Sequence, residues 1–323
     1  MKIKFPLSIF MIIVYFHLFA QINTIKLKPD SSFIEKTVIL EVDSIKIEGT
    51  LLLPNTTAKI PVVLIIAGSG PTDRNGNNPI MKNNSLKMLA DSLAKYNIAS
   101  LRYDKRGIAK SKIKNLKESD LRFEDYINDA VRWFEKLKKD TSFSEIVIMG
   151  HSEGSLIGMV AALKAGADKY ISLAGTGKSA NQIIRDQLKA QPEYITNAAL
   201  PLLKILEKGD TTHNVPPLLA SLFRPDIQPY LISWFGYDPA KEIKKLDIPV
   251  LLVQGTTDIQ VSVDNLELLK QANPDVDTLI VNGMNHILKE APADRLKNLE
   301  TYYKPDLPLA KGVVKKIVEF IKN

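Results

Sequence analysis

Residues 150–154, Gly-His-Ser-Glu-Gly, form the segment of this chain best suited to nucleophilic chemistry. The short apolar run at residues 145–149 is typical of a buried strand, and residues 155–163 have helical composition. A Gly-x-Ser-x-Gly motif between a strand and a helix forms a sharp turn that exposes the serine hydroxyl above the sheet. The motif therefore indicates Ser152 as a nucleophile, which needs a base to accept its proton and an acid to orient that base.

His286 is the best candidate for the base among the four histidines of the chain. His17 lies in an apolar N-terminal segment, His151 is expected to point away from the reaction at such a turn, and His213 lies in a proline-rich stretch. His286 instead follows the strand-like residues 277–281. A solvated loop histidine is the alternative interpretation of this residue.

Asp258 is the candidate for the acid. It lies on the loop after Gly255, which ends a predicted buried strand at residues 248–254. A carboxylate on this loop can orient the histidine and stabilise its protonated form. Asp264 lies instead at a predicted helix start, where aspartate commonly caps exposed N–H groups.

The order Ser152, Asp258, His286 resembles that of the α/β-hydrolases. Residues 254–258, Gln-Gly-Thr-Thr-Asp, and 283–286, Gly-Met-Asn-His, also resemble that superfamily, in its serine aminopeptidase-like or carboxylesterase-like branch. The resemblance runs from about residue 38 to the C-terminus. It implies an α/β-hydrolase fold and a Ser-His-Asp triad.

Two backbone N–H groups are needed to bind the oxyanion of the reaction. The resemblance assigns one to Glu153, the residue after the nucleophile, and the other to the loop after the apolar residues 61–67. Ser69 is the predicted donor on that loop, with Gly70 as the alternative. Residues 102–107, Arg-Tyr-Asp-Lys-Arg-Gly, also resemble the family, and we interpret them as a structural loop.

Strand and helix patterns alternate along most of the chain. Such alternation predicts a mostly parallel sheet flanked by helices, in which right-handed crossovers bring the three triad loops to one edge. A β-hairpin is predicted at the N-terminal side, at residues 37–42 and 46–53. The further predicted strands are residues 61–67, 98–103, 145–149, 169–173, 248–254 and 277–281, and the helices are about 85–96, 123–139, 153–165, 263–271 and 311–322.

The alternation breaks at about residues 178–245, which predicts an inserted helical cap. Helical segments are expected at residues 181–190 and 196–207, followed by a part rich in aromatic residues and proline. Caps in this fold commonly supply the substrate pocket, so one or two of Phe223, Tyr230 and Trp234 are predicted to line it. The alternative is that these aromatic side chains pack the cap onto the core.

The N-terminus has the features of a secretory signal peptide. Lys2 and Lys4 precede an apolar stretch at residues 5–19, and Ala20 is a plausible cleavage point. We therefore predict a signal peptide at residues 1–20, an α/β-hydrolase domain at residues 21–323, and export to the periplasm or the medium. An uncleaved signal anchor that tethers the protein to a membrane is the alternative.

Composition narrows the classes of function. The chain has 323 residues, of which 45% are hydrophobic, and this suffices for one large domain. Without cysteine it has no disulfide or thiolate metal site. The formal charge of +7 comes from lysines interleaved with acids, so we expect no nucleic-acid partner. No metal site, no cofactor and no stable membrane span after signal removal are predicted.

Three functions remain open from the sequence. The leading one is an exported serine hydrolase that cleaves a small carboxylic ester through an acyl-enzyme. The second is a serine aminopeptidase or amidase acting on short peptides, with Glu153, Glu193 or Asp226 receiving the substrate ammonium. The third is a non-catalytic binding protein, which is less favoured because all three triad members are present.

Overall fold

The computed structural model describes residues 33–42, 45–114, 116–189 and 191–323. The predicted signal peptide therefore lies outside the described residues. The strands are β1 (Phe33–Val42), β2 (Ile45–Pro54), β3 (Ile60–Ile66), β4 (Ala99–Tyr103), β5 (Phe143–His151), β6 (Lys169–Leu173), β7 (Val250–Gly255) and β8 (Asp277–Val281).

These strands form one sheet of eight in the order β1-β2-β4-β3-β5-β6-β7-β8. The hairpin β1–β2 is antiparallel, and β2 is antiparallel to β4. Every other neighbouring pair is parallel. The predicted hairpin and the predicted, mostly parallel sheet are both confirmed.

Most helices lie in the connections between the strands, and the last two follow β8. None of those in the described residues is long and apolar enough to cross a membrane. They are α1 (Ser85–Ala94), α2 (Phe123–Lys138), α3 (Glu153–Ala165), α4 (Ala180–Lys189), α5 (Glu193–Glu207), α6 (Ala220–Phe223), α7 (Gln228–Phe235), α8 (Pro239–Ile243), α9 (Asp264–Ala272), α10 (Arg295–Glu300) and α11 (Val313–Lys322).

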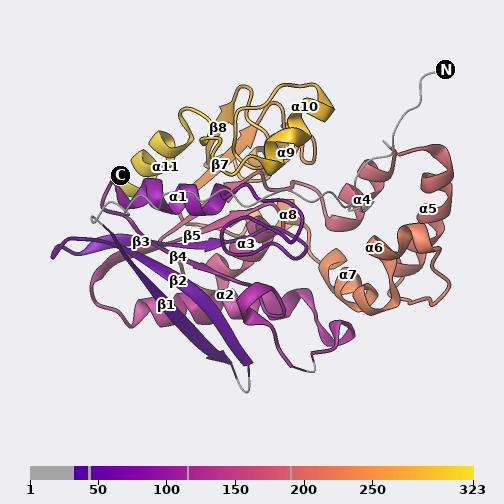
Figure 1. The fold of residues 1–323 in the computed structure, drawn as a ribbon, viewed down its shortest axis with the longest axis horizontal. Coiled ribbons are helices and arrows are strands. Elements are labelled where there is room, and N and C mark those ends of the chain that lie inside the picture. Colours follow the sequence, from indigo (N-terminus) through magenta and orange to yellow (C-terminus); the bar gives the residue numbers. More distant parts are fainter. Residues whose placement is uncertain (1–32, 43–44, 115, 190) are drawn as a thin grey trace, which may run out of the picture.

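The core lies in two layers, one on each face of the sheet. Side chains alternate along β3, so Val62 and Leu64 contact the cluster that includes α2, α3 and α9, whereas Val63 and Ile65 contact the cluster that includes α1 and α11. Figure 1 shows α1 and α11 on one side of the sheet and α2 on the other. Since both faces are covered, the buried residues of β3 and β5 are nearly all apolar, as expected for a parallel sheet.

Helices α4 to α7 lie between β6 and β7 and extend away from the sheet, on the right of Figure 1. They share an apolar cluster of their own, which includes Leu188 from α4, Leu203 from α5 and Phe223 from α6. The two longer helices agree with the sequence prediction. The shorter α6 and α7 were not predicted, because aromatic and proline-rich sequence gives no clear helical period.

Four loops follow the carboxyl ends of parallel strands and carry the predicted site residues. Ser69 follows β3, Ser152 follows β5, Asp258 follows β7 and His286 follows β8. In a parallel sheet these ends share one edge, which is where ligands bind in open α/β folds. The topology therefore brings together residues that are far apart in the sequence.

Candidate active site

Ser152 occupies a sharp turn between β5 and α3. Its φ of 56° and ψ of −121° are rare for a residue with a side chain and cost about 1–3 kcal/mol. The flanking glycines are required by close packing. A Cβ on Gly150 would lie 2.0 Å from the carbonyl oxygen of Gly154, and one on Gly154 would lie 2.4 Å from the carbonyl oxygen of Ile66. The local structure is thus the turn that the motif predicts.

His286 and Asp258 form a buried pair. His286 Nδ1 lies 2.7 Å from Asp258 Oδ2, and the Asp258 side chain is fully buried. The same carboxylate accepts hydrogen bonds from the backbone N–H groups of Gln260 and Val261 and from the side chain of Gln254. These contacts fix the carboxylate, and through Nδ1 they orient the imidazole so that Nε2 is left for another partner.

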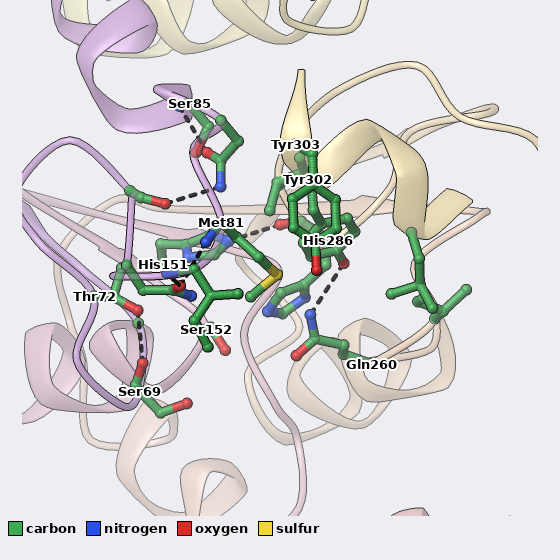
Figure 2. A pocket seen from close by; sticks show the side chains of 18 of the residues that line it. Ser69, Thr72, Met81, Ser85, His151, Ser152, Gln260, His286, Tyr302 and Tyr303 are labelled. Carbon is green, nitrogen blue, oxygen red and sulfur yellow. Dashed lines mark hydrogen bonds between the residues drawn. The ribbon is translucent and has the colours of Figure 1, made fainter. Parts of the chain in front are cut away.

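Ser152 and His286 line the same pocket, as Figure 2 shows. The pocket has a volume of about 320 Å³ and both polar and apolar walls. The structure thus brings the predicted serine, histidine and aspartate to one edge of the sheet. The pocket is lined by Gly68, Ser69, Thr72, Gly76, Asn78, Ile80, Met81, Asn83, Ser85, His151, Ser152, Ile259, Gln260, His286, Ile287, Arg295, Leu299, Tyr302 and Tyr303.

His151 lies closer to His286 and the pocket than the sequence predicts. It was expected to point away, yet it lines the pocket, and its ring centroid lies 4.9 Å from that of His286. Its Nε2 lies 2.7 Å from the carbonyl oxygen of His286. Burial, with a smaller contribution from nearby His286, lowers the pKa of His151 to about 4. His151 is therefore neutral at pH 7, and its Nε2–H donates to that carbonyl.

Ser69 and Glu153, the predicted oxyanion donors, flank the serine. Gly68 and Ser69 line the pocket, and a Cβ on Gly68 would lie 3.1 Å from Ser152 Cβ. Glu153 is the first residue of α3, so its N–H has no partner within the helix. Gly70, the alternative donor, is not among the lining residues that the structure describes.

The Glu153 side chain points into a buried network that the sequence did not reveal. Its carboxylate lies 2.5 Å from Lys105 Nζ and accepts a hydrogen bond from Tyr230 Oη at 2.7 Å. Lys105 belongs to the segment interpreted as a structural loop. Its neighbours fit that interpretation, because Asp104 pairs with Arg74 and Arg106 pairs with Asp129.

The predicted pocket role of the cap aromatics is not supported by the structure. Phe223 is fully buried within the cap cluster, Tyr230 contacts Glu153, and Trp234 stacks on Phe123 with ring centroids 5.7 Å apart. None of the three is among the described residues that line the pocket. Tyr230 and Trp234 pack the cap onto the core, as in the alternative interpretation, whereas Phe223 packs inside the cap.

Part of the pocket wall comes from α10 and the short 3₁₀ helix at Thr301–Tyr303. Nearby, the buried Lys289 donates hydrogen bonds to the carbonyl oxygens of Asn83 and Lys304, and burial lowers the pKa of Lys289 to about 8. No helix is predicted from the sequence in this segment. One signal was present, since Asp294 is a good helix cap and accepts from the Lys297 N–H.

Among the residues that the structure describes, no group of three or more His, Asp or Glu side chains could hold a metal ion. Asp264, which was predicted to cap a helix, is the first residue inside α9, and its side chain makes no capping hydrogen bond. It therefore acts on the helix only through its charge.

Two comparisons of the sequence with known proteins find similarity to hydrolases. Residues 82–216 match the family model described as serine aminopeptidase, S33. The chain is 29% identical over 247 residues to Esterase EstD of Thermotoga maritima, a match that covers 73% of this chain and 58% of the relative. The chain thus covers less than two thirds of that relative.

Solved structures share the fold at low sequence identity. Est1E from Butyrivibrio proteoclasticus, in its complex with ferulic acid, has a TM-score of 0.59 at 19% identity, covering 88% of this chain and 96% of that one. A bromoperoxidase from Bacillus anthracis has a TM-score of 0.53 at 15% identity, covering 89% and 100%. Together with the strand order and the turn at Ser152, these similarities show that the chain has the α/β-hydrolase fold.

Proposed function

We propose that this protein is a serine hydrolase that cleaves small carboxylic esters through an acyl-enzyme. The observation that carries the proposal is the convergence of the strained Ser152 and the His286–Asp258 pair on one pocket. Strain of this kind clusters at functional sites, and a non-catalytic binding protein would have no use for a strained serine that lines a pocket.

In the proposed mechanism, Ser152 Oγ attacks the acyl carbon of the ester while His286 Nε2 accepts the hydroxyl proton. Nε2 suits this role because Nδ1 is already bonded to Asp258. The carbonyl oxygen becomes an oxyanion, which the N–H groups of Ser69 and Glu153 bind.

Collapse of this intermediate breaks the ester C–O bond, and His286 returns the proton to the departing alcohol. Water then attacks the acyl-enzyme with His286 again as base. The second tetrahedral intermediate releases the carboxylic acid and restores the Ser152 hydroxyl.

The walls of the pocket favour an ester over a peptide with a free amino terminus. An aminopeptidase needs a carboxylate for the substrate ammonium, yet no aspartate or glutamate is among the described lining residues. Glu153 is buried against Lys105, and Glu193 and Asp226 are exposed on the cap. The pocket of about 320 Å³ is at the lower end for ligand sites, which suits a short acyl chain or a single ring.

We also propose export, because basic residues precede the apolar stretch that ends before Ala20 and Gln21. N-terminal sequencing of protein recovered outside the cytoplasm should begin within a few residues of Gln21. Protein found outside with an intact Met1 would support the signal anchor instead.

The function is tested by assaying p-nitrophenyl esters of increasing acyl length beside aminoacyl p-nitroanilides. We expect higher kcat/KM for short esters, and labelling by a fluorophosphonate probe that Ser152→Ala abolishes without loss of fold. A preference for the aminoacyl anilides would identify an aminopeptidase. A folded protein that neither turns over nor reacts with the probe would identify a binding protein.

A further inference from the structure

Lys105 connects the two segments that carry the proposed oxyanion donors. Its Nζ donates to the carbonyl oxygen of Gly68 at 2.7 Å and lies 2.5 Å from Glu153 Oε2. The side chains of Lys105 and Glu153 are only 2% and 3% exposed. Gly68 immediately precedes Ser69, and Glu153 immediately follows Ser152, so one ammonium group contacts both sides of the candidate site.

The contact with Gly68 bears directly on the Ser69 donor. The carbonyl of Gly68 and the N–H of Ser69 belong to the same planar peptide unit, in which they point in opposite directions. Holding the oxygen with Lys105 therefore fixes the direction in which the Ser69 N–H points. A charged donor on the carbonyl also polarises the peptide unit, which strengthens the opposite N–H as a donor.

The contact with Glu153 accounts for how an ammonium group is kept at this buried place. An unpaired buried charge is costly, and the Glu153 carboxylate compensates it at close range. The Tyr126 ring, whose centroid lies 4.9 Å from Nζ, and the Tyr230 hydroxyl on Glu153 complete the surroundings. Since the Lys105–Glu153 pair is neutral as a whole, it adds little net charge to the site. Its main effect is to orient the peptide groups that it contacts.

We propose that Lys105 is a positioning residue that holds the Gly68–Ser69 peptide in the orientation needed to bind the oxyanion. This inference rests on the proposed esterase function. Lys105 does not touch the reacting atoms and acts through the peptide. The effect should therefore fall on the transition state and spare binding of the ground-state ester.

The test compares Lys105→Met with a matched control, Lys169→Met. Lys169 also bridges a carboxylate and a carbonyl, at 3.0 Å from Glu145 and 2.6 Å from the Ile321 oxygen, but it begins β6 at the opposite edge of the sheet. We expect Lys105→Met to lower kcat on a p-nitrophenyl ester by about 10²–10³-fold, the loss typical of one oxyanion donor. KM should stay within about threefold of wild type, and Lys169→Met should keep both constants.

A second readout separates positioning from general damage. An alkyl boronic acid forms a tetrahedral adduct with a catalytic serine, so its affinity should fall by the same factor as kcat/KM in Lys105→Met. Loss of Lys105 alone leaves Glu153 unpaired, so the double variant Lys105→Met/Glu153→Gln, which removes both charges, is measured in parallel. It too lacks the donor to Gly68 and should show the same loss of kcat.

Failure of this inference and failure of the function give different results. Suppose that the wild type hydrolyses esters and the folded double variant keeps kcat within about threefold of the wild-type value, whether or not its KM rises. Lys105 then does not position the oxyanion site. If wild type hydrolyses no ester and binds no boronic acid, the proposed function is wrong and the inference falls with it.

Discussion

The cap and the segment around α10 differ in composition and in what they contribute to the site. The cap holds the aromatic residues that drew attention in the sequence, yet Phe223 is buried inside it and Trp234 packs on Phe123. The α10 segment supplies Leu299 and Tyr302 to the pocket wall. Both segments hold aromatic residues, yet only the one at the carboxyl edge of the sheet lines the pocket. The difference teaches that position in the fold, and not aromatic content, decides which side chains face the pocket.

The largest expected effect lies at that edge. Asp258→Asn should lower kcat by about 10⁴-fold, because an amide in place of the carboxylate favours the wrong tautomer of His286. Esterase kinetics on purified protein would measure this. The matched control is Asp264→Asn on α9, which should leave kcat unchanged and cost about 0.3–1 kcal/mol, since it removes only a charge near the helix start. A kcat above about a tenth of wild type in Asp258→Asn is too high for loss of a triad acid.

The cap should respond in stability and not in catalysis. Phe223→Ala leaves a cavity in the cap cluster and should lower the free energy of unfolding by about 3–5 kcal/mol. Urea denaturation would measure that loss, and kcat/KM of the folded fraction should stay within about twofold of wild type. A large rise in KM with unchanged stability would instead restore Phe223 as a pocket residue.

Loss of stability at low pH should also depend on a residue at this edge of the sheet, His151. The pKa of His151 is about 4 in the folded protein and about 6.5 when unfolded, so below pH 6.5 the unfolded state binds a proton that the folded state does not. Stability should therefore fall by about 3 kcal/mol as the pH drops from 6.5 to 4. Urea denaturation at several pH values would show this. In His151→Asn this part of the dependence of stability on pH should be absent. If the variant loses stability between pH 6.5 and pH 4 as the wild type does, the low pKa of His151 is contradicted.

The smallest expected effect concerns substrate affinity at the α10 wall. Leu299→Ala removes apolar contact with the acyl or leaving group and should raise KM about tenfold with little change in kcat. Kinetics on p-nitrophenyl esters of two acyl lengths would show whether the rise in KM is larger for the longer acyl chain. The matched control is Leu203→Ala in the cap cluster, which should lower stability and leave KM unchanged.

The sequence by itself indicated Ser152, Asp258 and His286 as candidate site residues. It also predicted the alternation of strands and helices around them. It could do so because the glycine motif and strand periodicity are local: Gly150 and Gly154 are required by atoms within a few residues or on the adjacent strand. Only the tertiary structure decided which side chains form the pocket and which charges pair. Lys105 and Glu153 are 48 residues apart, and such contacts depend on how separate strands align, which no local pattern records.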